Sequence, residues 1–452
     1  MRGFRVLVIG GGFAGIAAAS RLHARGAHVM LCDDRASLGG RARSDVLDGW
    51  TIDVGAQLIA TSYERTIAML RDGAGGRAPS LREMPGRDVY LRDGAAYPIN
   101  FGSLRSLLSF GAIGAADKVR LGMSLVPLLA RHRAALRVDA ERIPESLDGE
   151  SAGAFMSRTV SANAAFALVE PVSATFCGAR GHDVSLAFYL TLGRYGSEGD
   201  VLAPRHGWTA MLERALEGVE IARETRVTKI THTAGRVIMD ADDGRSWEGD
   251  AAVLATDAQS AATLLDPLGQ HELTEWLRGV RYRPSCTVAA TVSEPLRRDA
   301  FGLLVHNDGR RPVSALAIHG AKASPDSKRD GDVVLAWPTP DAADRLIHRP
   351  ASEIAAEIVP AIESLVPRAS GRIGHVRVYR HERGIALPAP GFTTDRTRGR
   401  ALARAVELPI ALAGDYLTMP LLEGAVASGE DAADRLASKL GLPVRAPARP
   451  AG

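Results

Sequence analysis

The first 32 residues constrain the fold more than any other part of the chain. Val6–Ile9 is a short apolar run, typical of a strand that is buried on both faces. Gly10–Gly15 follows it and spells G-x-G-x-x-G, after which Ile16–Arg25 has helical character and Gly26 ends the helix. Ala27–Leu31 is a second strand candidate. The segment therefore predicts a β-α-β unit of about 30 residues that opens on a glycine-rich turn.

The glycines, the helix and the acid of this unit each have a physical role in binding a dinucleotide. Gly10 permits the tight turn, Gly12 lets the backbone approach a pyrophosphate, and Gly15 allows close contact between helix and strand. The N-terminus of the helix offers free N–H groups and a positive dipole end to phosphates. Asp33 lies about 20 residues beyond the glycines and can accept hydrogen bonds from both hydroxyls of an unphosphorylated ribose, which favours FAD or NAD over NADP. The predicted contacts are Gly10, Gly12, Phe13, Ala14, Gly15, Asp33, Asp34 and Arg35.

A second glycine pair decides between these two cofactors. The stretch Asp33–Arg41, with Gly39-Gly40-Arg41 at its end, resembles the flavin amine oxidase superfamily. That superfamily includes monoamine and polyamine oxidases, protoporphyrinogen oxidase and carotenoid desaturases. The resemblance implies bound FAD, with Gly39 and Gly40 flat against the cofactor and Arg41 near its pyrophosphate. It also implies that the backbone of Gly55, Ala56 and Gln57 runs beside the isoalloxazine.

The C-terminal part of the chain resembles the matching FAD motif of the same superfamily. Pro409–Ala413 is strand-like and is followed by Gly414-Asp415, and an alanine-rich helix begins near Glu423. The resemblance implies that Asp415 helps hold the ribityl-phosphate region. The helix dipole would stabilise negative charge at N1/O2 of the reduced flavin. Further contacts implied by the resemblance are Val227 near the adenine, Ala255 and Thr256 after a middle strand, Gly414, Leu422, Glu423 and Ala425.

Composition excludes several other classes of protein. Lys and Arg number 55 against 52 Asp and Glu, a net charge of +3, which is too balanced for a dedicated nucleic-acid binder. Cys32, Cys177 and Cys286 lie far apart without a CxxC motif, so neither a disulfide framework nor a zinc site is predicted. No other metal site is predicted. The apolar run at the N-terminus is too short for a secretory signal, and a cytoplasmic location is the default expectation.

A chain of 452 residues is too long for one ordinary core. We predict an α/β protein with a discontinuous Rossmann-like FAD-binding domain, interleaved with an α+β substrate domain. The FAD-binding domain would comprise 1–85, 205–285 and 390–445. The substrate domain would comprise 86–204, which we expect to be largely helical, and 286–389, which we expect to form a mixed sheet. The apolar segment 104–129 is expected to be a core or tunnel-wall helix pair, or else a peripheral contact with a membrane.

Two features separate the chain from the amine oxidases it resembles. Many amine oxidases have an aromatic residue two positions before the motif glutamate, where this chain has Leu421. Many also carry a lysine on the sheet of the substrate domain, but Cys286–Val292 has none, and Lys322 is expected to lie in a polar loop. The block Pro171–Phe188 is similar to one shared by desaturases and protoporphyrinogen oxidases.

The resemblance therefore implies dehydrogenation of an organic, apolar or cyclic substrate by hydride transfer to flavin N5. Flavin amine oxidase and a non-redox, flavin-dependent isomerase are the alternatives. Since no second G-x-G-x-x-G follows a strand, electrons would come from the small-molecule substrate and pass to dioxygen or a quinone. No catalytic residue is identified. Polar candidates near the substrate domain are His182, Asp183, Arg194, Tyr195, Glu198, Arg205, His206 and His381.

Overall fold

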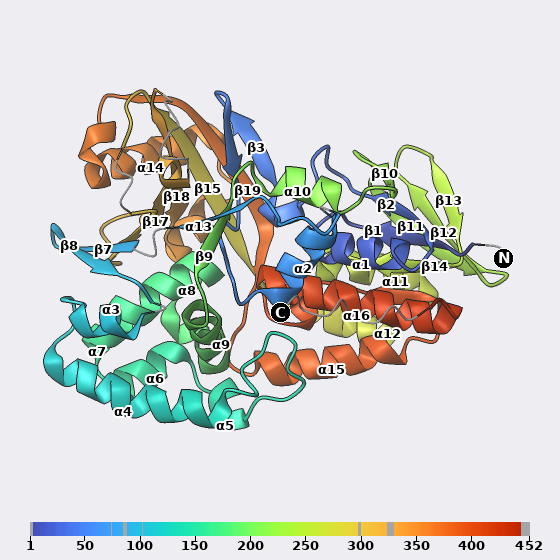
Figure 1. Cartoon of the computed structure of the whole chain (residues 1–452), viewed down its shortest axis with the longest axis horizontal. Coiled ribbons are helices and arrows are strands. Elements are labelled where there is room, and N and C mark those ends of the chain that lie inside the picture. Colours follow the sequence, from blue (N-terminus) through green and yellow to red (C-terminus); the bar gives the residue numbers. More distant parts are fainter. Residues whose placement is uncertain are drawn as a thin grey trace.

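The fold is built around two sheets, which a computed structural model shows side by side with helices around them (Figure 1). The structure describes residues 3–73, 75–84, 88–101, 103–296, 300–322 and 330–443. Mixed helix and sheet confirm the predicted α/β class. We propose that the two sheets mark the cofactor and substrate domains predicted from the sequence.

The first sheet has five parallel strands in the order β10-β2-β1-β14-β20. Its central strand is apolar on both faces, because Val6 and Val8 pack on one side and Leu7 and Ile9 on the other. The sheet gathers strands from distant parts of the chain, which is why both ends of the sequence contribute to it. The strands are β1 (Arg5–Ile9), β2 (His28–Cys32), β10 (Glu220–Ala222), β14 (Ala251–Leu254) and β20 (Ile410–Leu412).

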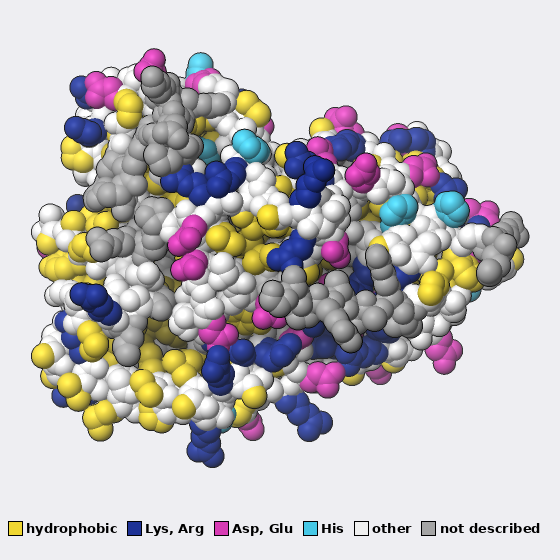
Figure 2. All heavy atoms as spheres, viewed as in Figure 1, with side chains coloured by type: hydrophobic (Ala, Val, Ile, Leu, Met, Phe, Trp, Pro, Cys, Tyr) yellow, Lys and Arg dark blue, Asp and Glu magenta, His cyan; other side chains and the backbone are white. Residues whose placement is uncertain are grey.

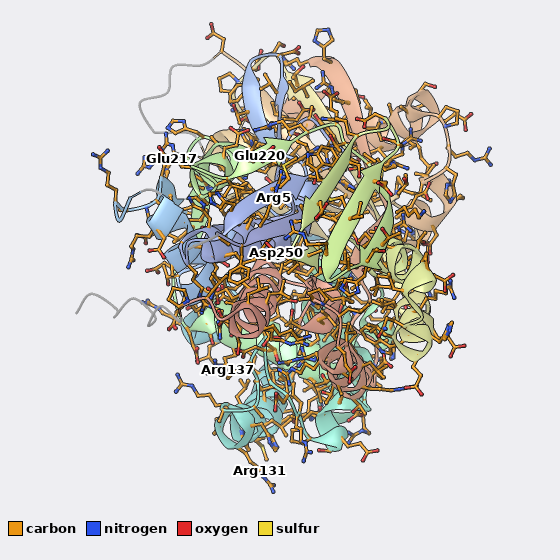
Figure 3. The ribbon with its side chains drawn as sticks, turned by 90° about the vertical axis from the view of Figure 1, so that its right-hand side faces the viewer. Arg5, Arg131, Arg137, Glu217, Glu220 and Asp250 are labelled. Carbon is orange, nitrogen blue, oxygen red and sulfur yellow. The ribbon has the colours of Figure 1, made fainter. Side chains whose placement is uncertain are left out.

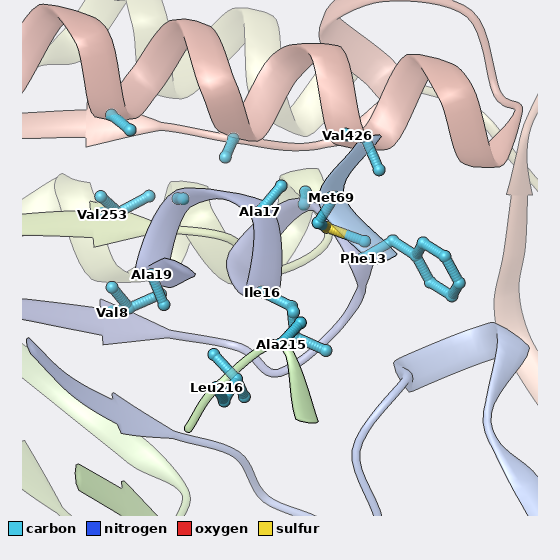
Figure 4. Close-up of a cluster of buried hydrophobic side chains, with 14 of the residues drawn as sticks. Val8, Phe13, Ile16, Ala17, Ala19, Met69, Ala215, Leu216, Val253 and Val426 are labelled. Carbon is cyan, nitrogen blue, oxygen red and sulfur yellow. The ribbon is translucent and has the colours of Figure 1, made fainter. Parts of the chain in front are cut away.

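Two long helices pack together on one face of this sheet. Ile16 and Ala17 of the first helix, Val253 of the sheet and Val426 of the last helix belong to one buried cluster (Figure 4). A Cβ atom at Gly429 would collide with the carbonyl oxygen of Ala14, so glycine there lets the two helices approach. The helices on this face are α1 (Phe13–His23), α2 (Glu64–Gly73), α10 (Trp208–Arg214) and α16 (Leu422–Leu440).

The other face of the parallel sheet is covered by a small antiparallel sheet and three helices. At this end of the sheet, the backbone N–H of Arg5 donates to Asp250 at 2.7 Å, and its guanidinium lies 3.3 Å from Glu220 of β10 in the same sheet (Figure 3). Asp250 connects β13 of the small sheet to β14 of the parallel sheet. The elements are β11 (Val227–Thr233), β12 (Arg236–Ala241), β13 (Ser246–Gly249), α11 (Ala258–Leu265), α12 (His271–Gly279) and α15 (Phe392–Ala405).

The second sheet has seven strands in the order β19-β15-β18-β17-β16-β7-β8 and is mixed. Ile354, Ile358 and Ile362 pack a helix against one face, while a hairpin around Trp50 packs against the other. The elements are β15 (Tyr282–Val292), β16 (Gly302–Val305), β17 (Val313–Ile318), β18 (Asp332–Pro338), β19 (Ile373–Ala386), α13 (Pro340–Leu346), α14 (Ala351–Leu365) and the hairpin β3 (Ser44–Leu47) and β4 (Trp50–Asp53).

The hairpin β7 (Asp88–Arg92) and β8 (Ala95–Ile99) completes this sheet and differs from the helical expectation for its segment. Asp93 and Gly94 form its turn with φ angles of 51° and 78°. An Asp-Gly pair suits such a turn, because both positions need positive φ. Strand β7 pairs in parallel with β16, which places Asp88 beside Gly302.

The rest of 86–204 is largely helical and lies at the lower left in Figure 1. Among the described residues, no helix is long and apolar enough to cross a membrane. The helices are α3 (Leu104–Ser109), α4 (Ala115–His132), α5 (Glu145–Asp148), α6 (Ala152–Thr159), α7 (Ala162–Ala164), α8 (Glu170–Cys177) and α9 (Leu186–Ser197). A small sheet of β5 (Ile59–Ala60), β6 (Leu81–Glu83) and β9 (Val201–Pro204) joins this block to the parallel sheet.

Candidate active site

One large cavity of about 1940 Å³ runs from the carboxyl ends of the parallel strands into the helical block. Typical small-molecule sites occupy roughly 300–1,000 Å³, so this cavity has room for a dinucleotide and a second molecule. All predicted cofactor contacts except Gly15 and Glu423 line it. The lining residues from the prediction are Gly10, Gly12, Phe13, Ala14, Asp33, Asp34, Arg35, Gly39, Gly40, Arg41, Gly55, Ala56, Gln57, Val227, Ala255, Thr256, Gly414, Asp415, Leu422 and Ala425.

The glycine-rich turn leaves open space where a pyrophosphate would lie. A Cβ atom at Gly12 would meet no atom within 4 Å, and Gly12 lines the cavity with an ordinary φ of −76°. Gly10 has a φ of +106°, and Gly15 packs so closely that a Cβ there would collide with the carbonyl oxygen of Gly10. Helix α1 begins at Phe13 without a side-chain cap. Its first N–H groups therefore fit the phosphates of the predicted FAD.

Asp33 holds the turn in shape and lines the cavity beside it. One carboxylate oxygen accepts the Gly11 N–H at 2.6 Å, and the other accepts the Arg35 N–H at 2.8 Å. Burial raises the pKa of Asp33, while these two hydrogen bonds oppose the shift. Each oxygen keeps a lone pair, because a carboxylate can accept about four hydrogen bonds. The residue thus has free acceptor positions for the ribose hydroxyls of the predicted FAD.

Arg41 and Asp415 join the N-terminal and C-terminal motifs. The Arg41 guanidinium lies 2.7 Å from the Asp415 carboxylate and also donates to the Gly384 carbonyl at 2.8 Å. Both residues line the cavity. The arginine side chain is still 37% exposed, so it retains N–H groups that a pyrophosphate would reach.

Glu423 is placed differently from its neighbours Leu422 and Ala425. Its carboxylate accepts the N–H groups of Arg65 and Thr66, both at 2.9 Å, and the Thr66 hydroxyl at 2.7 Å. These donors belong to the first turn of α2, so Glu423 stabilises the start of that helix rather than facing the cavity. The N-terminus of α16 still faces the cavity through Leu422 and Ala425.

The expectation that Lys322 lies in a polar loop is wrong. Its side chain is buried, with Nζ 2.9 Å from Oδ2 of Asp53 and 2.6 Å from Oε1 of Gln57. Burial lowers the pKa of Lys322, and the Asp53 carboxylate opposes the shift. Gln57 lines the cavity, so the hydrogen bond from Lys322 helps to hold the Gly55–Gln57 segment in place at the cavity wall. Nothing local in the sequence signals this position, because both partners lie more than 260 residues away.

The part of the cavity inside the helical block is predominantly aliphatic. Leu421, in the position where many amine oxidases have an aromatic residue, also lines it. The leucines contributed by helices α3, α4 and α9 are Leu107, Leu121, Leu125, Leu129, Leu190 and Leu192. This lining suits an apolar molecule, since apolar surface gains free energy when it leaves water.

Asp88 is a cavity-lining carboxyl group that sequence reasoning missed. One of its oxygens accepts the Gly302 N–H at 2.9 Å, and burial raises its pKa to about 6. The sequence gives no signal for it, because only the parallel pairing of β7 with β16 brings it to the cavity. A carboxyl group here could accept a hydrogen bond from a ligand or bind a cation.

Of the polar candidates predicted near the substrate domain, His381 alone lines the cavity. Burial and the nearby arginines, Arg43 first among them, lower its pKa to about 3, so the imidazole is neutral at pH 7. Arg194 instead pairs with Glu198 at 3.0 Å, and Arg205 donates to the Leu81 carbonyl. These two arginines do not anchor a ligand in the cavity.

Comparison with known proteins agrees with this geometry. The family model for flavin-containing amine oxidoreductases matches residues 13–437. The carotenoid phi-ring synthase of Streptomyces griseus is 26% identical over 478 aligned residues, covering 97% of this chain and 88% of that protein.

Two solved structures share the fold at low sequence identity. A protoporphyrinogen oxidase-like protein from Exiguobacterium sp. 255-15 superposes with a TM-score of 0.75 at 19% identity, covering 97% of this chain and 100% of that one. Cyclohexylamine oxidase from Brevibacterium oxydans IH-35A gives 0.72 at 17% identity, covering 97% and 100%. Because the family model spans nearly the whole chain, this protein belongs to the flavin-containing amine oxidoreductase family and is a FAD-dependent oxidoreductase.

Proposed function

We propose that the protein dehydrogenates an apolar or cyclic organic substrate held in the aliphatic part of the cavity. The observation that carries this proposal is the continuity of one cavity from the glycine-rich turn to the leucines of α3, α4 and α9. When bound, FAD supplies a two-electron acceptor that takes a hydride from a carbon next to a double bond or heteroatom. The substrate also loses a proton, so the product has one more double bond.

The chain's own groups would hold the cofactor and position the substrate. We propose that Gly12, Asp33, Arg41 and Asp415 bind the dinucleotide, for the geometric reasons given above. The N-terminal end of α16 would stabilise negative charge on the reduced ring through its dipole. The leucines would orient the substrate by shape and exclude water.

Amine oxidation is the second candidate, and Asp88 is the observation that favours it. A partly buried carboxylate in the lining of this cavity would bind an ammonium group through a charge-assisted hydrogen bond. The two features that oppose amine oxidation are Leu421 and the engagement of the Lys322 ammonium with Asp53 and Gln57.

The test is anaerobic reduction of the purified, FAD-loaded protein by a panel of a polyene, a porphyrinogen and primary and secondary amines. Bleaching of the visible flavin band by the polyene or porphyrinogen, with a dehydrogenated product, is the expected result. Reduction by amines alone would replace the proposal with amine oxidation, and the KM for the amine should then rise in Asp88→Ala. A rearranged product without net reduction would indicate an isomerase. Mixing the reduced protein with dioxygen or a quinone then identifies the electron acceptor by the faster reoxidation.

A further inference from the structure

The outward side of helix α4 is mostly apolar, with the exposed Arg120 between its apolar residues. Val119, Met123 and Val126 are 62%, 74% and 57% exposed, and their spacing places them on one side of the helix. Leu108 of α3 is 58% exposed nearby in the chain. We call this surface the α4 face, and Figure 2 shows hydrophobic side chains along the corresponding lower left of the molecule. The other exposed residues of the α4 face are Ala115, Ala116, Gly122, Pro127 and Ala130.

The segment that carries the α4 face is strongly basic. Residues 103–137 contain six Lys and Arg but a single acid, Asp117, whereas the whole chain has a net charge of only +3. Asp117 is itself paired with Arg120 at 3.7 Å, and two further bases pair with acids beyond the segment, Arg133 with Glu198 at 2.9 Å and Arg137 with Asp139 at 3.1 Å. Arg105, Lys118 and Arg131 therefore carry the positive charge of the face. Figure 3 shows the Arg131 side chain at the edge of the molecule, pointing away from it. The bases are Arg105, Lys118, Arg120, Arg131, Arg133 and Arg137.

The inward side of the same helix lines the cavity through Leu121, Leu125 and Leu129. Helix α4 thus lies between the aliphatic part of the cavity and the exposed α4 face. An ordinary surface helix keeps apolar residues on its inner side only, and contiguous exposed apolar surface marks an interaction site.

We propose that the α4 face docks on an anionic lipid surface, with its apolar residues at the headgroup boundary and its bases among the headgroups. Charge decides between the possible occupants. A second copy packed symmetrically on this face would bring Arg105, Lys118 and Arg131 of both copies together, which costs free energy through like-charge repulsion. An anionic bilayer supplies both the apolar layer and the negative charge, which gives about 1 kcal/mol per basic residue near the surface. This inference goes beyond the proposed function and does not depend on it.

The test is sedimentation of the FAD-loaded protein with vesicles of phosphatidylcholine alone and with about 30% phosphatidylglycerol. We expect at least tenfold stronger binding to the anionic vesicles, weakened by added salt because salt screens the attraction. The double variant Val119→Asp/Met123→Asp should lose at least about tenfold in binding. Val46→Asp is the matched control, since Val46 is 56% exposed on β3, away from the α4 face, and should bind as the wild type does.

Charge is tested separately with Arg105→Gln/Arg131→Gln, expected to weaken binding at least about fivefold, against Arg368→Gln on another surface. FAD content and melting temperature should be unchanged in all these variants, which separates lost docking from misfolding. The proposal is overturned if the wild type does not sediment with anionic vesicles, or if the double variant binds as well as Val46→Asp. It is also overturned if the wild type is a dimer that Val119→Asp/Met123→Asp dissociates, because a second copy would then cover the face.

Discussion

The Lys322 ammonium and the Asp53 carboxylate form an ion pair 2.9 Å long, with only 4% and 2% of the side chains exposed. The same carboxylate accepts hydrogen bonds from the Ser44 hydroxyl at 2.8 Å and the Trp208 N–H at 3.2 Å. Lys322 follows β17 of the seven-stranded sheet, whereas Asp53 is the last residue of β4, just before the Gly55–Gln57 segment. The pair therefore ties the substrate-side sheet to the wall of the cavity.

Replacing Lys322 by methionine should strongly destabilise the fold. The change keeps the length of the side chain but leaves the Asp53 carboxylate buried without its cation, which typically costs about 3–5 kcal/mol. Urea unfolding of the purified protein measures the loss. Lys229→Met is the control, because Lys229 is exposed on β11 and should change the unfolding free energy by less than about 0.5 kcal/mol. Equal stability of the two variants would contradict a structural role for the pair.

Gly12→Val should weaken FAD binding without destabilising the apoprotein. The φ of −76° at this position suits any residue, and the new side chain would project into open cavity space. The side chain would occupy the room that the backbone offers the pyrophosphate, so we expect at least tenfold weaker binding, or about 1.4 kcal/mol. Fluorescence titration of the apoprotein with FAD provides the measurement.

Gly15→Ala serves as the contrasting variant for this prediction. Its Cβ would collide with the carbonyl oxygen of Gly10, so it should lower the melting temperature of the apoprotein, which Gly12→Val should not. If Gly12→Val bound FAD as tightly as the wild type, the pyrophosphate would not lie at this turn.

Glu423→Ala should reduce stability more than cofactor affinity. Its carboxylate accepts two N–H groups and one hydroxyl at the start of α2 and does not line the cavity. Loss of such a cap costs about 1–2 kcal/mol. We expect a lower unfolding free energy for the apoprotein, with less than about a threefold change in FAD affinity. A large loss of affinity at unchanged stability would show instead that Glu423 contacts the cofactor.

Asp88 should make the stability of the protein depend on pH between about 4 and 6. Burial raises its pKa from 3.8 to about 6, so the folded state binds the proton more tightly than the unfolded state. Stability from this group is therefore greatest below pH 4 and falls as pH rises through about 6, by up to about 3 kcal/mol. Urea unfolding of Asp88→Asn, which keeps an acceptor for the Gly302 N–H, should show this decline removed. A constant difference from the wild type across this pH range would refute the assignment.

Local sequence patterns predicted the helices and strands that are specified mainly by neighbouring residues in the chain. Val6–Ile9 is within β1, Gly10–Gly12 precede α1, and Ile16–His23 of the predicted helix lies within α1. The hairpin 88–99 was missed, although its Asp93-Gly94 turn is a local signal. Lys322 was misplaced because its neighbours Gly320 and Ala321 suggest a loop, whereas its partners Asp53 and Gln57 come from another part of the fold.

The β-α-β unit, its acid at Asp33 and the family resemblance could all be read from the amino-acid sequence. A backbone conformation such as the positive φ at Gly10 restricts which residue types can occupy the position. Such positions can therefore be recognised in the sequence before the fold is known. The directions in which side chains face depend on the folded arrangement of the chain. This arrangement turned Glu423 towards α2, buried Lys322 against Asp53, brought Asp88 to the cavity and left Met123 exposed. Burial and pairing at these positions depend on segments tens to hundreds of residues away, and no local pattern records which segments will meet.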